Sequence, residues 1–159
     1  MAVYGAGTEV GEGARYGPVT AGCRLSMSTT QPSFRFDEPV RVRLVTENLS
    51  TPNLHVSFPS QFAFVAYRFD ISGSDGKPVP LTRYGQRQMD RAGSQPSAAV
   101  QPGESDVLDL AMFNRLYDMT IAGEYTVTAY RRVYPPGGSV EVQSNTIKII
   151  IHEQKATSN

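Results

Sequence analysis

Apolar residues occupy every second position in several short stretches of the chain, which is the pattern of a strand with one buried face. The stretches with this pattern are 19–27, 40–44, 62–71, 108–112, 125–129 and 140–151. Clusters of Gly, Pro, Asn, Asp and Ser separate them, as turns require. With a short return strand expected at 79–82, we predict seven or eight strands, no convincing helix, and an all-β, Ig-like antiparallel sandwich with Greek-key connections.

The first and last stretches make specific predictions. We expect the inward face of the first strand to be formed by Val19, Ala21, Cys23, Leu25 and Met27. In the last strand Val140 and Val142 have one parity, and Ile147, Ile149 and Ile151 have the opposite parity. One extra residue, a β-bulge near Ser144-Asn145, would reconcile the two parities.

The stretch from 62 to 71 is expected to be one long aromatic strand. Phe62 and Phe64 lie on the face opposite to the one that carries Tyr67 and Phe69. Apolar residues on both faces indicate that this end is covered by a loop or by a partner, so Phe62 and Phe64 are candidate interaction residues. The polar segment from 84 to 95 follows the hairpin at Asp75-Gly76 and the short return strand, and we expect it to be a long connection.

The segment from Leu116 to Arg132 carries the most informative local pattern. Asp118, Gly123 and Tyr125 have the spacing of a corner at which a Greek-key sandwich passes from one sheet to the other. In such a corner the tyrosine ring packs inward and its hydroxyl bonds to the backbone upstream. Tyr125, Val127 and Ala129 are therefore expected to face the core.

Residues 1–18 differ in composition from the rest of the chain. They contain five glycines and few large apolar side chains, so burial does not offset the entropy lost on ordering. We expect residues 1–18 to form a flexible or partner-docked arm, residues 19–153 to form the sandwich, and residues 154–159 to form a C-terminal tail. The candidate anchors of the arm are Val3, Tyr4, Val10 and Tyr16.

Fifteen basic residues balance fifteen acidic ones. A nucleic-acid partner or an anionic membrane would require a basic excess, so neither is expected. No apolar run reaches membrane-spanning length, and we expect no membrane insertion. The N-terminus lacks the basic start and apolar centre of a secretory signal. The protein is expected to be cytoplasmic if Met1 is the native start, and extracellular or at the cell surface if the chain is a processed form.

Residues suited to chemistry are few and scattered. Cys23 is the single cysteine, so neither an intrachain disulfide nor a cysteine metal site is possible, and a small buried thiol is expected. His55 and His152 lie in different regions, and no Gly-x-Ser-x-Gly elbow is present. We expect no catalytic, cofactor or metal site, and no enzyme activity.

The chain resembles the BsuPI-like group of bacterial Ig-like domains, which is named for an intracellular proteinase inhibitor. The matching segments are 40–50, 65–71 with Asp75-Gly76-Lys77, the turn 101–105, 123–127, and the Ser144-Asn145-Thr146 lead into the last strand. The resemblance implies a sandwich and suggests proteinase inhibition. This chain departs from the group by having no tryptophan and by its Gly-rich leader.

Three functions fit these features. The leading one is a non-catalytic protein–protein interaction module that self-assembles as a homo-oligomer through its arm or an edge strand, with filaments if the contacts do not close. The first alternative is a BsuPI-like proteinase inhibitor whose loop 84–95, with Arg87 and Arg91, enters a protease cleft. The second is a carbohydrate or small-ligand binding sandwich that uses Tyr130 and Tyr134.

Overall fold

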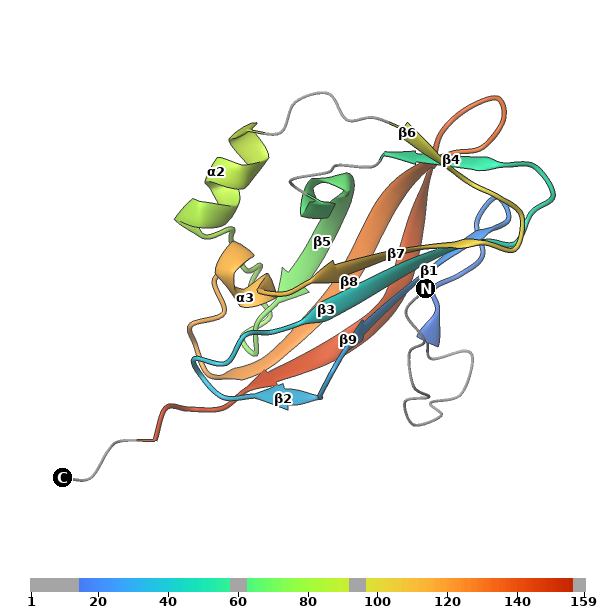
Figure 1. Ribbon diagram of the computed structural model, residues 1–159. Helices are drawn as coiled ribbons and strands as arrows, with labels where there is room; N and C mark the ends of the chain where they lie inside the picture. The colour runs from blue at the N-terminus through green and yellow to red at the C-terminus, as the bar shows by residue number, and fades with distance from the viewer. Residues whose placement is uncertain (1–14, 58–62, 92–96, 156–159) are drawn as a thin grey trace.

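The computed structural model describes residues 15–57, 63–91 and 97–155, and it has two stacked β-layers with a helical layer at one end (Figure 1). Its elements are β1 (Cys23–Thr29), β2 (Ser33–Phe34), β3 (Val42–Asn48), β4 (Leu54–Ser57), the 3₁₀-helix η1 (Ala63–Ala66), β5 (Tyr67–Ser72), α2 (Arg83–Arg91), β6 (Ser97–Val100), β7 (Ser105–Leu110), α3 (Phe113–Leu116), β8 (Gly123–Tyr134) and β9 (Val140–Ile151).

Two groups of antiparallel strands form the layers. In one layer β3 pairs with β1 and with β7, and in the other β8 pairs with β5 and with β9. These groups correspond to the A-B-E and C-F-G strands of immunoglobulin folds, so the predicted Ig-like all-β sandwich is confirmed. The described residues form nine strands rather than seven or eight. Two pairings, β1 with β9 and β2 with β9, are parallel, and the first of them joins the two layers.

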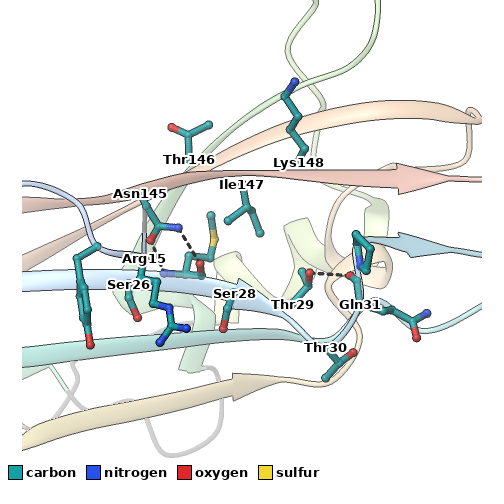
Figure 2. A pocket seen from close by; sticks show the side chains of 13 residues that line it. Arg15, Ser26, Ser28, Thr29, Thr30, Gln31, Asn145, Thr146, Ile147 and Lys148 are labelled. Atoms are coloured by element: carbon teal, nitrogen blue, oxygen red, sulfur yellow. Dashed lines mark hydrogen bonds between the residues drawn. The ribbon is translucent and has the colours of Figure 1, made fainter. Parts of the chain in front are cut away.

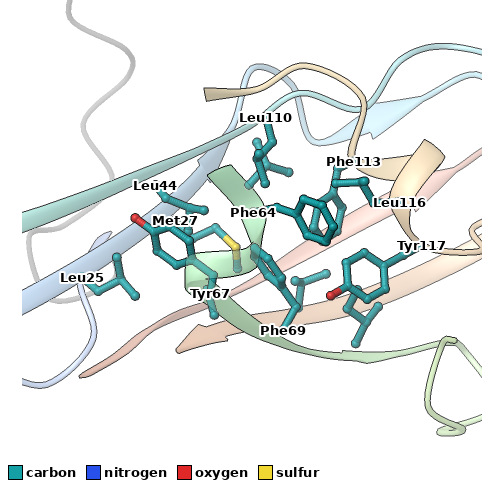
Figure 3. Packing of buried hydrophobic residues seen from close by; sticks show 14 of the residues in the cluster. Leu25, Met27, Leu44, Phe64, Tyr67, Phe69, Leu110, Phe113, Leu116 and Tyr117 are labelled. Atoms are coloured by element: carbon teal, nitrogen blue, oxygen red, sulfur yellow. The ribbon is translucent and has the colours of Figure 1, made fainter. Parts of the chain in front are cut away.

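The core fills the space between the layers and continues under the helices (Figure 3). The ring of Phe69 on β5 lies 5.1 Å from that of Phe113 on α3 and 5.8 Å from that of Tyr117, measured between centroids. These edge-on contacts are a favourable arrangement of aromatic rings. They show how α3 closes one end of the sandwich.

The inward positions of β1 are Cys23, Leu25 and Met27, all fully buried as predicted. The prediction for Val19 and Ala21 is wrong, because the strand begins only at Cys23. Val19 is 58% exposed, and Ala21 has a positive φ of 50° in a turn that bridges Thr20 to Cys23. The alternating apolar pattern therefore continued through a turn at residues 20–23, and the residue types there gave no sign of that turn.

The long strand predicted for 62–71 is also wrong at its start, where η1 precedes β5. A 3₁₀-helix has three residues per turn, so Phe64 and Tyr67 lie on the same side. Both are 4% exposed and belong to the core, and Phe64 is therefore not an interaction residue. Phe62 lies outside the described residues.

The connection predicted for 84–95 is a helix over Arg83–Arg91. Thr82 caps it, since its hydroxyl Oγ1 accepts from Gly85 N at 3.0 Å and its carbonyl accepts from Gln86 N at 2.9 Å. A Cβ at Gly85 would lie 2.2 Å from Leu116 O, so glycine permits the close packing of α2 on α3. Glycine and a polar composition concealed this helix in the sequence. The return strand predicted at 79–82 reduces to an isolated bridge between Leu81 and Tyr117.

The strand predicted over 108–112 ends early, whereas the bulge predicted in the last strand is present. Met112 is 45% exposed, because β7 ends at Leu110. Along β8 and β9, Thr128 pairs with Thr146 whereas Tyr130 pairs with Gln143. The extra residue therefore lies at Ser144-Asn145, which confirms the predicted bulge.

Candidate functional site

A cleft of about 740 Å³ lies between β1 and β9, and we call it the β1–β9 slot (Figure 2). The two strands run parallel and pair at one point, Leu25 with Ser144. Beyond that point β1 continues in pairing with β3, and β9 with β8, but these two strands form no further pair with each other. The volume is within the range of clefts that bind ligands. The slot is lined by Arg15, Tyr16, Ser26, Met27, Ser28, Thr29, Thr30, Gln31, Pro32, Asn145, Thr146, Ile147 and Lys148.

The slot exposes a stretch of strand edge on β9. Within the described residues, no strand pairs with the slot side of β9 between Ser144 and Ile150. Ile150 N donates to Pro32 O at 3.2 Å, so the N–H of Ile150 points toward this side. Because the backbone alternates along a strand, Thr146 and Lys148 direct their backbone polar groups the same way. Unpaired strand edges of this kind are templates for pairing with another chain.

The side chain of Asn145 crosses the slot and contacts the backbone of β1 (Figure 2). Met27 N donates to Asn145 Oδ1 at 2.8 Å, and Asn145 Nδ2 donates to Met27 O at 2.9 Å. This pair of hydrogen bonds copies the two that a residue of a neighbouring strand makes. Asn145 therefore takes the place of one residue of a strand that the described part of the chain does not supply between β1 and β9.

The other end of the slot is formed by the base of the arm. Gly17 N donates to Leu25 O at 3.0 Å, and a Cβ at Gly17 would lie 1.8 Å from Gln143 O. The ring of Tyr16 lies 3.7 Å from the guanidinium carbon of Arg24, a cation–π contact. Arg24 in turn donates from Nε to Glu47 Oε2 at 2.9 Å on the outer face of β3. Tyr16, a predicted anchor, thus fixes the chain at the mouth of the slot.

The slot and the arm carry opposite charges. Arg15 and Lys148 line the slot, and none of the described Asp or Glu residues does, although Lys148 Nζ also lies 3.4 Å from Glu124 Oε1. The residues before Arg15 include Glu9 and Glu12 and no Lys, Arg or His. Among the other predicted anchors, Val3, Tyr4 and Val10 lie outside the described residues.

The predicted corner residues come together at the start of β8. The hydroxyl of Tyr125 donates to Ile121 O, and its ring is buried. Gly123 has a φ of +142°, and Asp118 Oδ1 accepts from Thr120 Oγ1 at 2.6 Å. This arrangement confirms the tyrosine corner and assigns it a structural role.

The residues of the alternative functions lie elsewhere on the fold. Arg87 and Arg91 are exposed on α2, outside the slot. Tyr130 lies under the guanidinium of Arg68, 3.9 Å from its carbon, so one face of the ring is covered. Tyr134 is 40% exposed at the end of β8.

Groups with catalytic potential are buried or separated. Burial raises the pKa of the Cys23 thiol to about 11, which keeps it protonated at neutral pH. His55 is exposed on β4, and His152 is exposed just after β9. In the described part of the chain, no three His, Cys, Asp or Glu residues are placed to hold a metal ion. No helix there is long and apolar enough to cross a membrane.

Neither a protein-family model nor a curated protein matches the sequence. Among solved structures, the chain is similar to the X-ray structure of the Northeast Structural Genomics Consortium target SoR45, with a TM-score of 0.51 and 9% identity over 89% of this chain and 99% of that one. A second similarity is to the crystal structure of the periplasmic chaperone SfaE, with a TM-score of 0.38 and 12% identity over 85% of this chain and 60% of that one. The first similarity concerns the fold alone.

Proposed function

We propose that the protein is a non-catalytic interaction module that self-assembles by strand pairing, with arm residues of one copy entering the β1–β9 slot of another. The observation that carries the proposal is the interrupted pairing between two parallel strands, which leaves a stretch of β9 edge that no residue in 15–57, 63–91 or 97–155 pairs with in a strand. A strand added there gains backbone hydrogen bonds, and its side chains supply specificity.

The lengths of the slot and the arm are compatible. The unpaired stretch of β9 covers five positions between Ser144 and Ile150, or about 17 Å at the rise of an extended strand. Fourteen residues precede Arg15, and fully extended they span about 46 Å. The arm is therefore long enough to leave its own domain and fill the slot of a neighbour.

Composition supports the same pairing. Glu9 and Glu12 in the arm complement Arg15 and Lys148 at the slot. Val3 and Val10 are apolar side chains that suit the exposed side of Ile147, which points from β9 toward β1 in Figure 2. Opposite charges across an interface fix the register and accelerate association.

The anchorage of Tyr16 fixes the point at which the arm begins. Its contact with Arg24 places the base of the arm on the outer face of β1. Because Arg15 and Tyr16 line the slot, the arm begins at the slot, and the mass of the particle distinguishes an arm that fills its own slot from one that enters the slot of a second copy. An exchange that does not close on itself is head-to-tail and gives filaments.

The test is the mass of the particle. Sedimentation velocity of the full chain over a range of concentrations is expected to show species larger than the monomer. A variant lacking residues 1–14, with an unchanged circular dichroism spectrum, is expected to remain monomeric. A variant lacking residues 156–159 is the control and should assemble normally.

Salt and charge reversal sharpen this experiment. Glu9→Lys with Glu12→Lys should weaken assembly of the full chain, and added salt should reduce the difference between the variant and the unmodified protein. A full chain that is monomeric at every concentration contradicts the proposal. So does assembly that survives removal of the arm.

The alternatives stay predictions. The proteinase-inhibitor function rests on the BsuPI-like resemblance, and the inhibitory segment expected at 84–95 is helical over Arg83–Arg91. The carbohydrate-binding function retains Tyr134 as an exposed aromatic residue. Neither alternative has a described cleft built around its residues comparable to the slot.

A further inference from the structure

The proposed pairing meets an obstacle inside the slot. A strand that fills the slot can pair with β1 as well as with β9. Pairing with β1 requires the N–H and C=O of Met27, and the side chain of Asn145 already binds both. Met27 is 1% exposed, so these groups have little access to water in compensation. An incoming strand must therefore displace the amide of Asn145 before it can pair at this position.

We infer that Asn145 is a latch of the slot: its amide holds the backbone of Met27 while the slot is empty and releases it when the arm strand of a second copy enters. This inference rests on the proposed function. The exchange replaces two side-chain hydrogen bonds by two backbone hydrogen bonds of the same type. Its net effect is to lower the affinity of the slot for the arm and to protect the edge of β1 from indiscriminate pairing.

The backbone of the bulge has support that does not come from the side chain of Asn145. The hydroxyl of Ser144 accepts from Ala129 N at 2.8 Å and donates to Asn145 O at 2.7 Å. Ser144 is 2% exposed. The backbone of the bulge is thus held by Ser144 rather than by the amide of Asn145, so replacing Asn145 should preserve the shape of β9.

The chain offers a matched control in Asn114. Its Oδ1 accepts from Val40 N at 3.0 Å, and its Nδ2 donates to Glu38 O at 3.1 Å. Asn114 therefore makes the same kind of backbone clamp as Asn145, but on α3 and outside the slot. Asn114→Ala should alter stability without altering access to Met27.

The experiment compares the full chain with its Asn145→Ala and Asn114→Ala variants by sedimentation equilibrium. Loss of the latch removes two hydrogen bonds that compete with the incoming strand. Asn145→Ala is therefore expected to assemble at about one tenth of the concentration that the unmodified protein needs, or below that. Asn114→Ala is expected to assemble like the unmodified protein. Asn145→Ser, which adds no charge to the slot and shortens the side chain that binds Met27, is the second variant if the alanine variant does not fold, and it should also assemble more tightly.

Amide hydrogen exchange at Met27 gives a second readout. In the monomer, this amide should exchange faster in Asn145→Ala than in the unmodified protein, and assembly should restore its protection. Equal assembly constants for the Asn145 variants and the unmodified protein overturn the latch and leave the proposed function standing. If the full chain and every variant are monomeric, the proposed function and the latch both fail.

Discussion

Arg131 in the middle of β8 donates from Nη1 to Oδ2 of Asp106 on β7 at 2.7 Å, so an ion pair joins the two layers through the interior. The guanidinium also donates to Thr46 Oγ1 at 2.6 Å and to Ser57 O at 3.1 Å. The side chain of Arg131 is 3% exposed and that of Asp106 is 19% exposed. Burying a guanidinium is costly, and among the described residues Nε of Arg131 is buried without a hydrogen-bond partner, so the fold depends on the remaining partners staying in place.

Removing the carboxylate should destabilise the fold more than a surface change does. Asp106→Ala leaves the buried guanidinium without its counter-charge, and we expect a loss of about 3 kcal/mol or more in the free energy of unfolding. Asp109 lies on β7 like Asp106, but its ion pair with Arg43 is exposed. Asp109→Ala should therefore cost no more than about 1 kcal/mol in the free energy of unfolding. Urea denaturation followed by circular dichroism measures both.

The double variant Arg131→Met with Asp106→Leu tests the interpretation. Replacing both partners removes the buried charge together with its partner, so much of the stability lost in Asp106→Ala should return. If the double variant is as unstable as the single one, packing at this site rather than the unpaired charge explains the loss.

Alkaline pH should destabilise the protein because a buried thiol and a buried phenol ionise more readily in the unfolded chain. Burial raises the pKa of Cys23 to about 11 and that of Tyr117 to about 12. In the unfolded chain both groups ionise at lower pH, so the unfolded state loses protons first. The stability that these groups contribute is fully present below about pH 8.5 and is lost progressively as the pH rises toward 12.

Thermal unfolding between pH 8 and 11 measures this effect. The melting temperature of Cys23→Ala should be lower at pH 8, because the buried side chain is smaller, but it should fall less steeply between pH 9 and 11. A thiol reagent at pH 8 should react with Cys23 only after a denaturant is added. Rapid labelling of the native protein would contradict the assigned burial.

The sequence predicted features that depend on neighbouring residues. The tyrosine corner follows from the spacing of Gly123 and Tyr125, and the bulge at Ser144-Asn145 follows from a change of parity within one strand. The bulge is where β9 leaves β1, so the origin of the slot was visible in the sequence. The slot itself was not, because it depends on which strands separate in space.

Residues whose type conflicts with their location were missed. The alternation from Tyr125 to Ala129 continues to Arg131. An arginine at an inward position normally indicates that the buried face has ended, unless partners for its charge are known. Those partners, Asp106 and Thr46, come from β7 and β3 and are distant in sequence. The amide of Asn145 was missed for the same reason, since its partner Met27 lies 118 positions away.

The hydroxyl of Tyr125 stabilises the corner by its hydrogen bond to Ile121 O. Tyr125→Phe keeps the buried ring and removes this bond, so we expect a loss of about 1 kcal/mol in the free energy of unfolding. Tyr134→Phe is the control, because that side chain is 40% exposed at the far end of β8. Denaturation midpoints should decrease for the first variant and remain unchanged for the second.

A side chain at Gly123 should destabilise the fold for two separable reasons. Its φ of +142° is unfavourable for any other residue, and a Cβ would lie 2.5 Å from Ser74 Oγ. That hydroxyl accepts from Glu124 N at 2.8 Å, so displacing it breaks the bond that starts β8. Gly123→Ala should therefore cost more than about 1 kcal/mol, whereas Gly138→Ala, whose Cβ meets no atom within 4 Å, should cost little. In a Ser74→Ala background the clash disappears and the backbone strain remains, so the cost of Gly123→Ala measured by denaturation should decrease without vanishing.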